Sequence, residues 1–128
     1  MTGPNRQEMI YHLTFTQDWD AAVSVGSYRI SGRGMTLESE GFLHFSYASQ
    51  LAGVAGRFWR DPGAPVVLLT VDPELLASPV VAENTGGGRE LFPHVYGPLP
   101  VTAVVSVTPV QVDDDGSLAL PAVGQPSA

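Results

Sequence analysis

The stretch PVVLLTVD, at positions 65–72, is the clearest strand signal in this chain of 128 residues. Its apolar residues are consecutive and the run is short, which is typical of a strand covered on both faces. A turn-forming segment with Pro62, Gly63 and Pro65 leads into it. We therefore expect 65–72 to be a buried strand, and we place the other elements around it.

The segment before this strand predicts two strand–helix pairs. MIYHLTF at 9–15 mixes β-branched, aromatic and aliphatic residues and predicts a first strand. Thr16 is a candidate N-cap for a short amphipathic helix over 17–25, which Gly26 ends. The alternation of a strand places its side chains on two faces, with Ile10, His12 and Thr14 on one and Tyr11, Leu13 and Phe15 on the other.

A second pair follows a long connection. Residues 27–40 are rich in Gly and Ser and predict an irregular loop. GFLHFSY at 41–47 predicts a strand that opens onto a helix from Ala48 or Ser49 to Trp59. The expected apolar stripes of the two helices are Trp19, Ala22 and Val23 in the first, and Leu51, Val54, Ala55 and Phe58 in the second.

The second half of the chain predicts strands and turns. Strands are expected at 79–84 and 101–112, the second with a break near Pro109, and a helical turn is expected at 73–77. The glycines at 86–88 predict a turn or hinge, DDDG at 113–116 a turn, and SLAL at 117–120 a short strand. LFPHVYGPLP at 91–100 has too many prolines for a helix or a central strand.

Five or six strands with two helices, both in the first half, predict an α+β fold with a mixed, mostly antiparallel sheet. At this length one core is expected. We predict a single domain over residues 9–121, with flexible termini at 1–8 and 122–128.

Composition narrows the classes of function. The chain has a net charge of −7, no cysteine, and six arginines but no lysine. Without cysteine it has neither disulfides nor thiolate chemistry. Few cations disfavour binding to extended nucleic acid, whereas one or two arginines and backbone N–H groups suit a small phosphorylated ligand. The polar N-terminus and the lack of a long apolar run predict a cytoplasmic protein without a membrane segment.

The three histidines, His12, His44 and His94, are the main candidates for chemistry. Their separations match no local metal-ligand pattern, and HExxH is absent, so we expect no metal. Ser46 follows His44 closely, but no GxSxG motif accompanies it, which disfavours a serine nucleophile. Aromatic residues flank the histidines and suit either stacking on a planar ring or core packing: Tyr11, Phe42, Tyr47, Phe92 and Tyr96. Carboxylates near strand ends that could orient a histidine are Asp72, Glu83 and Glu90.

Three segments together carry a resemblance to a known family. IYHLTF at 10–15, GFLHFS at 41–46 with the helix after it, and LFPHVYGPLP at 91–100 resemble a bacterial family of domains of unknown function, number 952 in that series. The resemblance spans about residues 9–111. That family in turn is remotely similar to the ADP-ribosyltransferase fold, which includes the RNA 2′-phosphotransferases and the poly-ADP-ribose polymerases.

The remote similarity implies an ADP-ribosyltransferase-like fold and roles for particular residues. His12, in YHLT, matches a histidine that contacts the adenosine ribose of NAD in YHGT strings. HFS at 44–46, the helix after it and PVVLL at 65–69 follow the order found in the RNA 2′-phosphotransferases. The implied catalytic residues are His44, as a platform for nicotinamide, and His94 or Tyr96, with Glu83 as an alternative, in the late catalytic position; the implied cofactor-binding residues are His12, Thr14, Ser46 and Tyr96.

The late strand-borne glutamate of many of these transferases is replaced here by FPHVYG, and three hypotheses follow. The first is NAD-dependent transfer of ADP-ribose or phosphate in a histidine-lined cleft. The second is a catalytically inactive module that binds a nucleotide or small metabolite. The third is a protein-interaction domain. The sequence does not indicate an oligomeric state.

Overall fold

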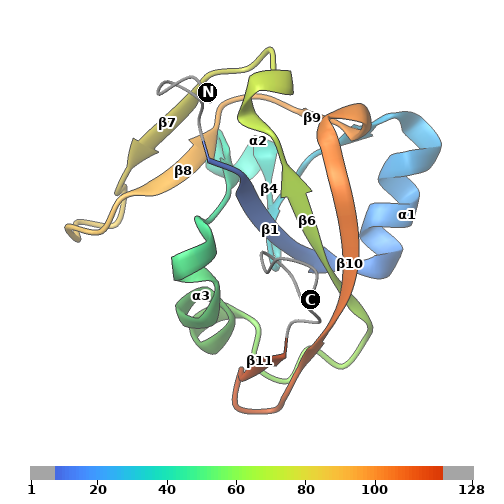
Figure 1. The fold of residues 1–128 in the computed structure, drawn as a ribbon, viewed down its shortest axis with the longest axis vertical. Helices are drawn as coiled ribbons and strands as arrows, with labels where there is room; N and C mark the ends of the chain where they lie inside the picture. The colour runs from blue at the N-terminus through green and yellow to red at the C-terminus, as the bar shows by residue number, and fades with distance from the viewer. Residues whose placement is uncertain (1–7, 120–128) are drawn as a thin grey trace, which may run out of the picture.

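Strand β6 (Val66–Val71), the predicted buried strand, lies in the middle of the main sheet in the computed structural model, which describes residues 8–119. It pairs with β1 (Ile10–Phe15) on one side and β10 (Val104–Val112) on the other, and β11 (Leu118–Ala119) extends the sheet beyond β10 (Figure 1). All of these pairs are antiparallel. The prediction of an α+β fold with mostly antiparallel strands is confirmed.

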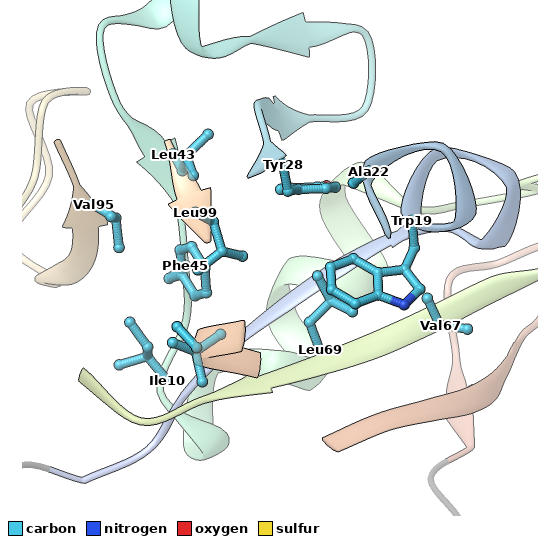
Figure 2. Packing of buried hydrophobic residues seen from close by; sticks show 12 residues of the cluster. Ile10, Trp19, Ala22, Tyr28, Leu43, Phe45, Val67, Leu69, Val95 and Leu99 are labelled. Atoms are coloured by element: carbon cyan, nitrogen blue, oxygen red, sulfur yellow. The ribbon is translucent and has the colours of Figure 1, made fainter. Parts of the chain in front are cut away.

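Both faces of the main sheet are covered. Helix α1 (Thr16–Val25) packs on one face and helix α3 (Leu51–Phe58) on the other, and the two lie on opposite sides of the sheet in Figure 1. Figure 2 shows the Trp19 indole of α1 beside Val67 and Leu69 of β6. The alternation predicted for the first strand is confirmed, because Ile10 belongs to the core on the α1 side and Leu13 to the core on the α3 side.

Helix α1 differs in detail from its prediction. The helix begins at Thr16 itself, and the cap position is Phe15, which makes no side-chain capping bond. Gly26 ends the helix in the left-handed conformation, as expected. Val23 is exposed although it was placed on the apolar stripe, because the helix buries only Trp19 and Ala22.

The prediction of an irregular loop over 27–40 is wrong. Strands β3 (Ile30–Gly32) and β4 (Met35–Thr36) form a hairpin, and α2 (Leu37–Glu40) is a single turn with a reciprocal cap between Thr36 and Ser39. Strand β2 (Ser27–Tyr28) pairs with the distant β9 (Leu99–Pro100). Strands of two or three residues are too short to show an alternating pattern, so these strands have no periodic signal in the sequence.

The prediction for the proline-rich segment is also wrong. Strand β8 (Phe92–Val95) is the central strand of a second sheet, between β5 (Leu43–His44) and β7 (Val80–Glu83). The Pro93 carbonyl accepts a hydrogen bond from the Phe45 N–H at 3.0 Å. The N–H that Pro93 lacks would point to the same side, toward Phe45 directly after β5, so the pairing loses one hydrogen bond at its end.

The remaining connections are short turns. The 3₁₀ helix η1 (Ala48–Gln50) precedes α3, η2 (Pro73–Leu75) forms the predicted helical turn, and η3 (Val101–Ala103) replaces the start of the predicted strand at 101–112. Strand β10 continues through Pro109, and its register shift lies earlier, between Val104 and Ser106.

The turn at Gly116 shows how closely the end of the chain packs on α3. Gly116 has φ +87°, and a Cβ there would lie 2.6 Å from the Cα of Gly56 in α3. Only glycine fits both this positive φ and this close contact.

No helix among residues 8–119 is long and apolar enough to span a membrane. The predicted flexible termini, apart from Glu8, lie outside the described residues.

Candidate functional site

A cavity of about 490 Å³ lies where α3, the β3–β4 hairpin, β1, β5 and the β7–β8 loop meet. Its lining includes His44 and His94 from the second sheet and Leu51, Val54 and Trp59 from α3 and the residue that follows it. A volume of this size suits a small-molecule ligand. The cavity therefore defines the candidate site.

The charge of the cavity wall differs from that of the whole chain. Arg33, Arg57 and Glu40 are the lining residues with a formal charge, so the wall carries one net positive charge. The chain as a whole carries −7. The two arginines are therefore the groups of this wall that attract an anion, and Glu90, 3.9 Å from Arg57, opposes them.

His94 is held by a carboxylate that is shared with a tyrosine. Its Nδ1 lies 2.9 Å from the Glu83 carboxylate, which also accepts a hydrogen bond from the Tyr96 hydroxyl. A carboxylate only accepts, so Nδ1 carries the proton and Nε2 of the neutral ring is the acceptor. The Tyr96 bond and then the His94 bond hold the pKa of Glu83 below its usual value, and the same Tyr96 bond raises the pKa of the phenol.

His44 lies opposite His94 in the β5–β8 pair. The two rings meet edge to face, with centroids 5.2 Å apart, and Phe42 stacks on His94 at 4.0 Å. Partial burial, followed by the neighbouring His94, lowers the pKa of His44, and Glu40 opposes this shift from 3.8 Å. Its buried Nε2 has no hydrogen-bond partner within the part of the chain that the structure describes. His44 therefore favours the neutral form and keeps one nitrogen unused.

His12 has a different environment. Its Nδ1 donates to the His44 carbonyl at 2.5 Å, and its Nε2 accepts from the Tyr28 hydroxyl at 2.7 Å. Burial lowers its pKa to about 4. His12 contributes to the cavity wall, but both nitrogens are already bonded within the protein. It connects β1 to β5, and its role in cofactor binding stays a prediction.

The other predicted site residues fall into two groups. Ser46 lines the cavity, and its backbone pairs with Tyr11 through two bonds of 2.8 Å. Thr14 is buried on the same strand face as His12, in the core. Glu83 and Tyr96 do not line the cavity and reach it only through His94. The structure thus gathers His44, His94, Glu83 and Tyr96 into one cluster.

Two arginines of the site were not singled out by the sequence. Arg33 donates to the carbonyls of Arg60 and Asp61, and its guanidinium lies 5.8 Å from the Phe15 ring centroid and 5.7 Å from that of Trp59. Arg57 lies on α3 at the cavity wall. The sequence predicted that one or two arginines bind a small phosphorylated ligand, but only the fold shows which arginines share a cavity.

The β7–β8 loop closes one side of the cavity. The Asn84 side chain accepts hydrogen bonds from the Gly86 and Gly88 N–H groups at 2.9 and 3.0 Å and donates to the Glu90 carbonyl at 2.7 Å. The glycine run is therefore a turn, as predicted.

Among residues 8–119, no three His, Cys, Asp or Glu side chains group closely enough to hold a metal ion.

The family assignment follows from residues 13–107, which match the family described as Protein of unknown function (DUF952). The chain belongs to this family. It is similar to protein CC0527 from Caulobacter crescentus, whose crystal structure is 32% identical, with a TM-score of 0.73 over 88% of this chain and 94% of that one. The solution NMR structure of CC0527 gives 33% identity and a TM-score of 0.68, over 85% and 90% of the two chains. No curated protein matches the chain.

Proposed function

We propose that the cavity binds a nucleotide of the NAD or ADP-ribose class and that His94, oriented by Glu83, is the acid–base group of an ADP-ribosyl transfer. The observation that carries the proposal is the Glu83–His94 pair at a cavity whose wall is net positive. Aromatic and apolar lining suits a planar ring, and cationic lining suits phosphates.

The remote similarity to the ADP-ribosyltransferase fold supports the same ligand class. The motifs around His12, His44 and His94 occur in the order expected from that fold, and the first two meet through the hydrogen bond from His12 to the His44 carbonyl. In this proposal His44 is the platform for the nicotinamide end. Its unpartnered Nε2 suits a hydrogen bond to the ligand.

The proposed step uses His94 as a base. Nε2 takes the proton of an acceptor hydroxyl or of water, and that oxygen bonds to the ribose carbon that carried nicotinamide. The carbon–nitrogen bond breaks with its electron pair on the pyridinium nitrogen, so nicotinamide leaves neutral and needs no proton. The proton stays on the imidazole, where the adjacent Glu83 carboxylate stabilises the positive charge.

A nucleotide-binding module without catalysis is the second candidate, and one observation favours it. The Glu83 carboxylate is occupied by His94 and Tyr96 and does not line the cavity. No direct contact from Glu83 to the cationic ribose is therefore available. In this candidate the same cavity binds ADP-ribose or NAD and releases it unchanged.

Incubation with NAD, followed by chromatographic measurement of free nicotinamide, tests the proposed reaction. His94→Gln keeps a polar side chain of similar length but removes the base, and we expect a loss of roughly 10²- to 10⁴-fold. His44→Ala should also abolish turnover without unfolding the protein. Far-UV circular dichroism and calorimetric titration of ADP-ribose confirm folding and binding in each variant.

The outcomes separate the two candidates. Nicotinamide release that depends on His94 supports the transferase. Tight ADP-ribose binding without any nicotinamide release on long incubation supports the binding module. If neither NAD nor ADP-ribose binds at millimolar concentration, both nucleotide proposals are wrong.

A further inference from the structure

We propose that Arg57 forms an anion subsite for the phosphate groups of the ligand and that Glu90 occupies this subsite when no ligand is bound. The inference rests on the proposed function only in taking the complete ligand to be a nucleotide. The phosphate subsite itself is tested separately below.

Arg57 has donors to spare. It lines the cavity, its side chain is 60% exposed, and its nearest acidic group is Glu90, with 3.9 Å between Nη2 and the carboxylate oxygen. This distance exceeds that of a hydrogen bond. An exposed ion pair of this kind contributes little to stability, so a ligand can replace it at small cost.

Glu90 is held without the help of Arg57. The Gln50 amide nitrogen donates to the Glu90 carboxylate at 3.1 Å and to the Leu91 carbonyl at 2.8 Å. Gln50 is buried, and its own amide oxygen accepts from the Tyr47 N–H. The loop therefore keeps its place when Arg57 turns away from Glu90 toward a ligand.

Arg33, the other arginine of the wall, is already committed. Both of its terminal nitrogens donate to backbone carbonyls in the turn after α3. It adds positive charge to the cavity but has fewer donors left for a ligand. Arg57 is thus the arginine whose guanidinium can form two parallel hydrogen bonds to a phosphate.

Phosphate is the group that the subsite selects. A diphosphate carries more negative charge than the single Glu90 carboxylate, and its oxygens match the donors of a guanidinium. The diphosphate therefore competes with Glu90 for the Arg57 guanidinium, and the charge of Glu90 weakens its binding. A neutral nucleoside gains nothing from this exchange.

Calorimetric titration of three probes into four variants tests the subsite. The probes are ADP-ribose, adenosine and inorganic pyrophosphate. The variants are Arg57→Gln and Glu90→Gln, with Arg29→Gln and Glu38→Gln as matched controls, since Arg29 and Glu38 form an exposed ion pair that does not line the cavity. Each control makes the same change of net charge as its counterpart.

We expect Arg57→Gln to weaken ADP-ribose and pyrophosphate about tenfold and to leave adenosine unchanged. Glu90→Gln should strengthen the two phosphorylated probes several-fold, because it removes the competing carboxylate. The control variants should bind all three probes as the wild type does.

The failures of the subsite and of the nucleotide proposal are distinguishable. If pyrophosphate binds in a manner that depends on Arg57 and ADP-ribose does not bind, the subsite is supported and the nucleotide proposal is wrong. ADP-ribose binding that is equal in the wild type and Arg57→Gln overturns the subsite and leaves the nucleotide site. Equal losses in Arg29→Gln and Arg57→Gln, or no binding of either phosphorylated probe, also overturn the subsite.

Discussion

His12 in the main sheet and His94 in the second sheet are almost equally buried, at 4% and 3% exposed, but their partners differ. The partners of His12 are a carbonyl and a phenol, which leave the desolvation of a charged ring uncompensated. The partner of His94 is a carboxylate, which accepts a hydrogen bond from Nδ1. Burial alone therefore does not assign a histidine to the core or to a site; the charge of its partner does.

The two sheets differ in the same way. Strand β1 pairs with β6 along six residues and is covered on both faces, so His12 is buried although it contributes to the cavity wall. Strand β5 pairs with β8 along two residues, and the facing pair of His44 and His94 lines the cavity. The long pairing holds His12 in a buried position, whereas His44 of the short pairing stays partly exposed at the cavity wall.

The largest expected effect is on folding stability at pH 7. His12→Ala leaves the Tyr28 hydroxyl and the His44 carbonyl without their partner and opens a cavity in the core, which should cost about 4 kcal/mol in the free energy of unfolding. His44→Ala, at a half-exposed position, should cost less than about 1 kcal/mol. Urea denaturation measures both, and equal losses would contradict the contrast between the two sheets.

Stability should also depend on pH through His12. Its folded pKa of about 4 is below the usual 6.5, so the unfolded chain takes up a proton that the folded chain refuses. The free energy of unfolding should therefore fall by on the order of 3 kcal/mol between pH 6.5 and 4 and lose this dependence below that window. Denaturation across this range should give a flatter profile for His12→Gln than for the wild type; identical slopes would show that His12 is not held neutral.

A smaller effect is expected when the carboxylate beside His94 is neutralised. Glu83→Gln keeps an oxygen that accepts from Nδ1 but removes the charge that stabilises protonated His94. Under the transferase proposal, kcat for nicotinamide release should fall at least about tenfold with little change in KM. A rise in KM at constant kcat would instead assign Glu83 to ligand binding.

The smallest effect is expected for Tyr96→Phe. Because the Tyr96 bond is the main cause of the low pKa of Glu83, its removal should move that pKa back toward the usual value and change turnover only a few-fold. Carbon-13 NMR of the Glu83 carboxyl across pH 2 to 7 measures the midpoint directly. An unchanged midpoint would mean that the phenol does not act on this carboxylate.

Long elements were predictable from the sequence and short ones were not. β1, β6 and both principal helices have a periodicity that can be read along the chain. Strand β8 was missed because Pro93 argues against a central strand, and its acceptable position depends on where β5 ends, far away in sequence. The hairpin of β3 and β4 was missed because its strands are too short to show alternation.

The site was predictable to a similar extent. His44, His94 and Glu83 were chosen from residue type, motif and resemblance, and the structure places them in one cluster. Arg57 and Glu90 could not be paired from the sequence, because they meet only when the β7–β8 loop packs beside α3. The structural role of His12 depends on the hydrogen bond between its Nε2 and the Tyr28 hydroxyl. Tyr28 lies in the segment that was predicted to be an irregular loop.

Nitrogen-15 NMR of the three imidazole rings at pH 7, recorded during titration with ADP-ribose, distinguishes the role of His12 from those of His44 and His94. We expect the ring signals of His44 and His94 to shift in a saturable manner. We expect His12 to remain a neutral ring with its proton on Nδ1 throughout. Unchanged His44 and His94 signals at saturating ADP-ribose, or a change of tautomer or charge at His12, would contradict the assignment of one histidine to the core and two to the ligand site.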